Sequence, residues 1–131
     1  IFHTLFLGIG RMRHGCRVLN KAGMVWICRE FNAVKELACA PDALWDGHWR
    51  LTASSAGTLV QGAQVRALGP EGLAHCPDWR DTGLPRAVLE AAPAVWCNEV
   101  MIAAPAAGMA AGWQAKSERR REDSFATALS H

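Results

Sequence analysis

Two tryptophans and an arginine in the stretch LWDGHWRL have side chains that suit contact with RNA. A tryptophan ring stacks on a nucleobase, and the guanidinium group of arginine binds phosphate. The stretch is equally typical of a tight hairpin, because Asp46-Gly47 accepts the positive φ that both central positions of such a turn need. Trp45 and Trp49 would then anchor the two strands. We therefore interpret the tryptophans as packing residues and only Arg50 as a phosphate-contact candidate.

The remaining positive charge is unevenly distributed along the chain. The net charge is only +2, but residues 1–66 carry eight basic and four acidic residues, whereas residues 67–131 carry six and eight. The densest basic cluster consists of Arg11, Arg13, His14 and Arg17. Two interpretations of this cluster are open: a patch that follows RNA phosphates, and a solvated face of a strand. The total charge is too small for an autonomous nucleic-acid binder, so another part of the protein would have to supply much of the affinity.

No catalytic motif is recognisable in the 131 residues. The chain lacks a G-x-x-x-x-G-K-[ST] phosphate loop, a G-x-G-x-x-G turn and a G-x-S-x-G elbow. Asp42 and Asp46 are four residues apart, but Gly47 breaks the helix that would align them, so they are expected to be turn residues. The Arg29-Glu30 pair is expected to form a structural ion pair or an inter-domain contact. The residues therefore favour a non-catalytic domain.

Five cysteines stand at positions 16, 28, 39, 76 and 97, without any C-x-x-C pair. Their odd number and wide spacing argue against a disulfide framework and favour a reducing cytoplasm. A zinc site formed by three of them and a histidine is an alternative, although structural zinc usually has closely paired ligands. We expect free cysteines that act as small buried hydrophobes, and no metal. The three cysteines of the zinc alternative are Cys16, Cys28 and Cys39.

The residue patterns predict several short strands and one or two short helices. One hairpin is expected around a four-residue loop, NKAG, a second around Asp46-Gly47, and a third around Asn98-Glu99. A further strand with Val60, Ala63 and Val65 should end at Gly69-Pro70, and the segment 71–83 is loop-like. A short helix is expected over LPRAVLEAAP, and a helical turn over NAVKEL. The fold class is therefore α+β, as a compact β-rich domain of packed antiparallel or mixed strands.

Some single residues carry expectations of their own. Trp26 and Trp96 fall in strands and should be core, whereas Trp79 and Trp113 lie in loop-like sequence and could be exposed. His48 is expected to be a turn or surface residue and not a metal ligand.

The chain is expected to have three parts and no membrane span. Residues 1–10 are an apolar lead-in from a preceding domain, residues 11–115 form the β-rich domain, and residues 116–131 form a charged tail with a mobile ERRRED run. The absence of an initiator methionine indicates either a piece of a longer protein or simple processing, and ATALSH is expected to be a natural C-terminus.

Six motifs in a fixed order resemble the C-terminal region of tRNA(Ile)-lysidine synthetases, chiefly α-proteobacterial ones, some of which are labelled cell-cycle proteins. They are HGCRV, VWICRE, LWDGHWRL, VRALGPEG, GLPRAVLEAAPAVW and VMIAAPAAG, which together cover about residues 11–110. The family uses ATP to join lysine to C2 of a wobble cytidine in one isoleucine tRNA. Its N-terminal PP-loop domain, with an S-G-G-x-D-S signature, holds ATP and magnesium. That signature is absent here, so the resemblance implies a fragment that holds no cofactor and cannot carry out the reaction alone; whether the fragment has an enzymatic activity of its own stays open.

The resemblance also implies a partner, a fold and contact residues. The C-terminal domain of the family is similar to an accessory domain of phenylalanyl-tRNA synthetase, and grips the acceptor end of the tRNA. Arg66 lies on the matching strand and is the first RNA-contact candidate, followed by Arg80 and Arg86. Alternatively these arginines are solvated, or are paired with Asp78, Asp81 or Glu90. The segment EGLAHCPDWRD carries less positive charge than its counterpart in better-known members, which argues for weaker RNA binding.

The residue patterns and the family resemblance together give the full set of RNA-contact candidates and the other expected partners. The expected partners are tRNA, the PP-loop domain of the same protein and a second copy of the chain in a homodimer. A β-rich protein-interaction or dimerisation module without RNA binding is the alternative function. The candidates are Arg66, Arg86, Arg80, Arg11, Arg13, Arg17 and Arg50.

Overall fold

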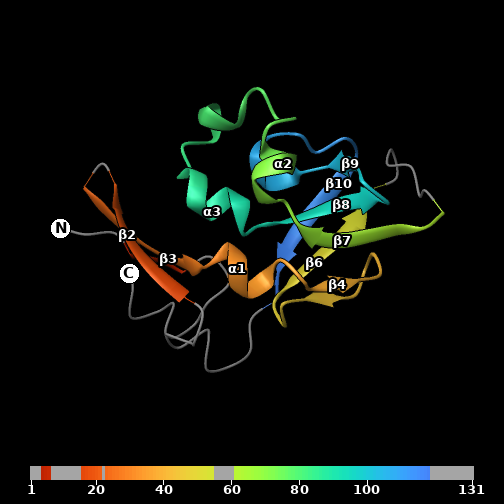
Figure 1. Ribbon diagram of the computed structural model, residues 1–131, viewed down its shortest axis with the longest axis horizontal. Coiled ribbons are helices and arrows are strands. Elements are labelled where there is room, and N and C mark those ends of the chain that lie inside the picture. The colour runs from red at the N-terminus through yellow and green to blue at the C-terminus, as the bar shows by residue number, and fades with distance from the viewer. Residues whose placement is uncertain (1–3, 7–15, 22, 55–60, 119–131) are drawn as a thin grey trace.

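The computed structural model describes residues 4–6, 16–21, 23–54 and 61–118 of the 131. In these ranges the chain forms three small sheets, of three, three and four strands, with short helices between them. Figure 1 shows the sheets and helices gathered in one body, with β2 and β3 extending to one side. The predicted β-rich α+β class is confirmed. None of the described helices is long and apolar enough to cross a membrane.

The first sheet contains β1 (Thr4–Phe6), β2 (Cys16–Lys21) and β3 (Met24–Arg29), in the order β1-β3-β2. The β2–β3 hairpin confirms the first predicted hairpin, but its loop is shorter than four residues. Lys21 pairs directly with Met24, so Asn20 and Lys21 belong to the strand. The turn-forming residue types therefore led to an overestimate of the loop length. Backbone pairing between the two strands continues up to the last residue that the turn permits.

The second sheet contains β5 (Leu44–Trp45), β6 (Trp49–Ala53) and β10 (Trp113–Ser117), in the order β10-β6-β5. Trp45 pairs with Trp49 across the predicted turn, where Asp46 and Gly47 have φ values of 54° and 68°. The His48 N–H donates to the Trp45 carbonyl at 3.1 Å. The predicted hairpin and the role of Asp46 as a turn residue are both confirmed.

Strand β10 corrects the expectation that Trp113 lies in loop-like sequence. It pairs antiparallel with β6 over five residues, and Trp113 lies opposite Ala53. Trp113 is only 3% exposed, so its predicted position in an exposed loop was wrong. The sequence of this strand is too short and too rich in alanine for a clear alternation of polar and apolar residues.

The third sheet contains β4 (Ala38–Cys39), β7 (Ala63–Ala67), β8 (Pro93–Cys97) and β9 (Val100–Ala103), all antiparallel in that order. The predicted hairpin at Asn98-Glu99 joins β8 to β9, and Asn98 has a φ of 56°. Val60 lies outside the described residues, and the strand that was expected to include it begins at Ala63.

The helices are short and lie in the loops between the strands. They are α1 (Phe31–Val34), α2 (Gly69–Leu73), the 3-10 helix η1 (Trp79–Thr82), α3 (Arg86–Glu90) and the 3-10 helix η2 (Pro105–Ala107). Helices α1 and α3 confirm the two predicted ones. The expectation of a loop over 71–83 was wrong in part, because α2 begins at Gly69 and η1 covers Trp79–Thr82. Proline suits the first turn of a helix, where its missing N–H has no partner to lose.

The third sheet lies between two apolar clusters, one on each face. Val65 and Val95 face the second sheet and pack with Trp45, Leu51 and Trp113. The opposite face carries Ala94 and Trp96, which pack with residues from the helices and from the loops beside them, namely Leu68, Leu73, Cys76, Leu89, Ala104 and Ala107. A third cluster joins Trp26 and Cys28 to Val88. The predicted core positions of Trp26 and Trp96 are confirmed, and both faces of β8 are buried, which explains its continuous apolar sequence.

Candidate nucleic-acid interface

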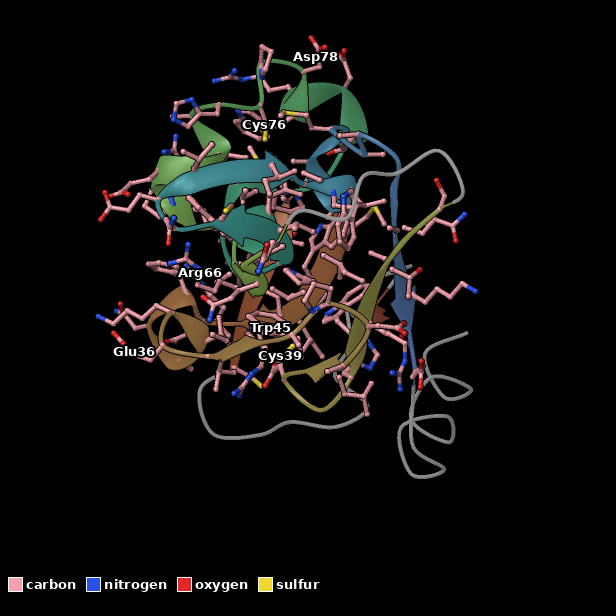
Figure 2. The ribbon with its side chains drawn as sticks, turned by 90° about the vertical axis from the view of Figure 1, so that its right-hand side faces the viewer. Glu36, Cys39, Trp45, Arg66, Cys76 and Asp78 are labelled. Atoms are coloured by element: carbon pink, nitrogen blue, oxygen red, sulfur yellow. The ribbon has the colours of Figure 1, made fainter. Side chains whose placement is uncertain are left out.

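Arg66 is the predicted contact residue with the most distinctive surroundings. Its guanidinium carbon lies 4.9 Å from the centre of the Trp96 ring, within the range of a cation–π contact. One guanidinium nitrogen, Nη2, donates to the backbone carbonyl of Asn98. Figure 2 shows Arg66 toward one side of the body, with the buried Trp45 nearer its middle. The strand that the resemblance identified therefore presents its arginine at an aromatic ring.

Two N–H groups beside this contact have no hydrogen-bond partner among the described residues. They are Nε of Arg66 and Nε1 of Trp96, and both atoms are shielded from solvent. A buried donor without an acceptor costs about 1–3 kcal/mol, and more when the group is charged. Because this cost arises at two neighbouring residues, the binding of a hydrogen-bond acceptor to them is favoured. The acceptor is a water molecule or a ligand oxygen that reaches the two N–H groups when the side chains move.

A cleft of about 460 Å³ is lined in part by Arg66 and Trp96, the residues that carry these two donors. Its side chains combine two cations, two carboxylates and two aromatic rings, from Arg66, Lys35, Glu71, Glu99, Phe31 and Trp96. The volume is in the range that binds small molecules. The two cations and two carboxylates balance in formal charge, so the cleft suits a ligand that carries both an anionic and a hydrogen-bond-donating group.

Glycine permits close packing at two positions of α2, and the first of them, Gly69, lines the cleft. Gly69 has a φ of +69°, and a Cβ there would lie 3.1 Å from the ring of Phe31. At Gly72, a Cβ would lie 3.0 Å from Cζ2 of Trp96 and 2.6 Å from Cδ1 of Leu68. Helix α2 therefore approaches β8 closely because residue 72 has no side chain.

Arg80 and Arg86 do not line this cleft. The guanidinium carbon of Arg80 lies 4.6 Å from the centre of the Trp79 ring, and Trp79 is half-buried in η1. Arg86 forms an ion pair with Glu90, with Nε 2.8 Å from the carboxylate, and its side chain is 60% exposed. The predicted alternative of an arginine paired with Glu90 is thus confirmed for Arg86. An exposed pair of this kind is weak and leaves an arginine accessible to phosphate.

Arg50 is engaged on the surface of the second sheet. Its guanidinium group forms a two-point ion pair with Glu118, one contact being 3.0 Å, and also donates to the Asp42 carbonyl. The hydrogen bond from Arg50 lowers the pKa of the Glu118 carboxyl. The pair ties the end of β10 to β6. A phosphate at Arg50 would therefore compete with Glu118.

The basic cluster near the N-terminus lies mostly outside the described residues. Arg11, Arg13 and His14 fall there, whereas Arg17 is exposed on β2. Arg29 at the end of β3 forms a half-buried ion pair with Asp46, at 3.0 Å. The predicted structural ion pair at Arg29 is confirmed, and it fixes the first sheet to the β5–β6 turn.

His48 corrects one expectation and confirms another. It lies in the turn as predicted, but it is only 1% exposed and is therefore not a surface residue. Its Nε2 lies 2.7 Å from the Ser117 hydroxyl, and its ring meets that of Trp49 edge-on. The turn folds His48 back onto the second sheet, where β10 covers it. That burial depends on the long-range pairing of β10, which sequence reasoning did not predict.

The cysteines are free, and two of them are buried as expected, Cys28 and Cys76. Burial raises the pKa of the Cys28 thiol to about 11, although Arg17 acts in the opposite direction. A thiol with such a pKa is a poor nucleophile and a poor metal ligand near neutral pH. In the part of the chain that the structure describes, no group of three or more His, Cys, Asp or Glu residues is arranged to hold a metal ion.

Sequence reasoning found Arg66 but missed the other residues of its cleft. Phe31 belongs to α1 and Lys35 to its C-terminal cap, Glu71 to α2 and Glu99 to the turn before β9, and nothing in the sequence indicates that these three segments meet. The dipeptide Gly69-Pro70 was the one sequence signal for the cleft. It was interpreted as the end of a strand, whereas it begins the helix that lines the cleft.

Comparison with known proteins confirms the resemblance that the six motifs indicated. The chain is 46% identical, over 117 residues or 89% of its length, to a protein of Ruegeria pomeroyi named tRNA(Ile)-lysidine synthase. It spans about 27% of the length of that relative. No family model and no solved structure matches the chain.

Proposed function

We propose that this chain is the C-terminal tRNA-recognition domain of a tRNA(Ile)-lysidine synthetase and that it is not itself catalytic. The observation that carries the proposal is the 46% identity over 117 residues to a tRNA(Ile)-lysidine synthase. In the proposed parent enzyme, ATP and magnesium are held by an N-terminal PP-loop domain. The S-G-G-x-D-S signature of that domain is absent from the present sequence.

The proposed role of the chain is to bind the acceptor end of tRNA and so help place the distant wobble cytidine. Binding energy gained far from the reacting base can orient that base, which lowers the entropic part of the barrier. RNA phosphate can reach the guanidinium groups of four arginines, namely Arg66, Arg80, Arg86 and Arg17. It can also reach Arg50 when the ion pair between Arg50 and Glu118 breaks. The small net charge of +2 is consistent with a domain that shares the affinity with the rest of the enzyme.

The proposal is tested by separating binding from catalysis. The chain should retain tRNA(Ile) in a filter-binding or anisotropy assay at low salt, and should form no lysidine when tRNA, ATP, magnesium and lysine are supplied. The Ruegeria pomeroyi relative is the positive control for lysidine formation. Lysidine made by the chain alone would contradict the non-catalytic role, and a lack of tRNA binding at low salt would contradict the recognition role.

The proposed homodimer needs a separate measurement. Sedimentation equilibrium of the chain with and without tRNA would give its mass. A monomer at every concentration tested would remove the homodimer from the proposal and leave tRNA recognition unaffected.

A further inference from the structure

We infer that the cleft beside Arg66 and Trp96 binds one unpaired, amino-bearing nucleotide of the RNA, with its phosphate on Arg66. The inference rests on the proposed function, because it takes RNA as the partner. It goes further by assigning one cavity, one chemical group and a preference among bases.

The two unpaired donors argue for a phosphate. Nε of Arg66 and Nε1 of Trp96 belong to residues that line the cleft, and neither atom has an acceptor among the described residues. A phosphate offers several acceptor oxygens, and arginine is well matched to it in charge and geometry. Both nitrogens are shielded from solvent in this conformation, so the guanidinium group has to turn away from Trp96 to meet the ligand. That movement gives up the contact with the Asn98 carbonyl and uncovers the indole.

The indole that Arg66 leaves is a stacking surface for a base. The guanidinium carbon now occupies a position 4.9 Å from the centre of the Trp96 ring, on the ring face that a base would take. Base–aromatic stacking needs an unstacked, unpaired nucleotide, because a base inside a duplex is not free to enter a cleft. The cleft volume of about 460 Å³ suits one nucleotide.

The carboxylates of Glu71 and Glu99 argue for a base with an amino group. Both line the cleft, and neither has an ion-pair partner in the ranges that the structure describes. A carboxylate accepts a hydrogen bond from the exocyclic amino group of cytosine, adenine or guanine, whereas uracil has no amino group and offers only its ring N3–H as a donor. Inorganic phosphate lacks the base that would stack on Trp96 and donate to these carboxylates, so it should bind more weakly than a nucleotide.

The direct test follows the Trp96 indole N–H by NMR in the 15N-labelled chain. Its cross-peak is identified by its loss in Trp96→Phe. Adenosine monophosphate should move this peak, whereas uridine monophosphate and inorganic phosphate should need at least about fivefold higher concentrations for the same change. The double variant Glu71→Gln, Glu99→Gln should bring the two nucleotides close to equal, because an amide is a poorer partner for a base amino group.

A second readout uses tRNA affinity and variants that keep the fold. Arg66→Lys retains the charge but loses Nε–H and should weaken tRNA binding roughly tenfold, as expected for a lost charged hydrogen bond. The matched control is Lys116→Arg, which exchanges one exposed cation for another on β10, lines no part of this cleft and is not among the RNA-contact candidates. The control should change tRNA affinity less than twofold.

The outcomes separate the inference from the proposed function. If the indole peak stays fixed at every nucleotide concentration, or moves as readily with inorganic phosphate, the inference is wrong. Arg66→Lys with wild-type tRNA affinity would also overturn it, while tRNA binding by the wild-type chain would keep the proposed function. If the wild-type chain binds no tRNA, the proposed function fails and the adenosine monophosphate titration still decides whether the cleft takes a nucleotide.

Discussion

Arg50 and Arg66 differ in what their guanidinium groups already contact. Arg50 is held by a carboxylate, Glu118, and by the Asp42 carbonyl. Arg66 has a single carbonyl partner and an aromatic ring, and its Nε is unpaired among the described residues. Displacement of Arg66 by a ligand therefore breaks fewer interactions. This difference ranks Arg66 above Arg50 as an RNA contact, and the amino-acid sequence alone could not supply it.

The Arg50–Glu118 pair leads to a prediction about pH. The pKa of Glu118 lies below its ordinary value of 4.5 because Arg50 donates to its carboxylate. A carboxyl with a lowered pKa in the folded state stabilises the protein above that ordinary value, and the contribution is lost as the pH falls through the folded pKa. Glu118→Gln should therefore lower the urea midpoint slightly at pH 7, and this difference from the wild type should shrink as the pH falls below 4.5.

Glu36→Gln is the matched control for that prediction, because Glu36 is exposed and has no ion-pair partner among the described residues. The effect of Glu118→Gln should be small, since exposed ion pairs contribute little. Equal midpoint changes for the two variants at pH 7 would show that the pair does not form in solution.

Among the secondary-structure elements, local patterns were sufficient for hairpins and insufficient for β10. The β5–β6 and β8–β9 hairpins join neighbouring segments, and Asp46-Gly47 and Asn98-Glu99 mark their turns. Strand β10 instead pairs with β6, which is far away in the sequence, and its only strong apolar residue is Trp113. Pairing between strands that are far apart in the sequence depends on which sheet edge is still unpaired in the folded protein. A short window of sequence does not contain this information.

Helix α2 was missed for a related reason. Its five residues include two glycines and a proline, and glycine disfavours a helix. Packing on β8 overrides that preference, since Gly72 and Leu73 are buried beside Trp96 and Leu68. The first residues of α2 also line the cleft. Because the segment was predicted to be a loop, neither the helix nor the cleft was predicted.

The close approach of α2 to β8 predicts the effect of Gly72→Ala. Helix propensity alone would favour alanine by about 1 kcal/mol. The new Cβ would lie 2.6 Å from Leu68 Cδ1 and 3.0 Å from Trp96 Cζ2, however, and both side chains are buried. Overpacking of this kind costs about 1–3 kcal/mol, so the free energy of unfolding should fall when measured by urea denaturation.

Gly83→Ala serves as the control for overpacking. A Cβ there has nothing within 4 Å, but φ is +76°, so its cost of about 1 kcal/mol comes from the backbone alone. Gly72→Ala should also lower the affinity for nucleotides, because it displaces Trp96, whereas Gly83→Ala should not. If Gly72→Ala is as stable as the wild type or more stable, the described packing of α2 on β8 is wrong.

For the molecule as a whole, the charge distribution predicts a modest RNA binder with one well-defined subsite. The net charge is +2, and several cations are already paired with acids, as at Arg29, Arg50 and Arg86. Affinity for RNA phosphate falls as salt rises, in proportion to the number of phosphates that the protein neutralises. The chain should therefore show a shallow but measurable dependence on salt.

The measurement that tests the account most directly is tRNA affinity as a function of salt for the wild type and for Arg66→Ala. We expect the wild-type dissociation constant to rise steadily with salt. Arg66→Ala should bind more weakly and lose about one unit of the log–log slope, because one phosphate contact is removed. Identical slopes and affinities for the two proteins, or no tRNA binding at low salt, would contradict the account.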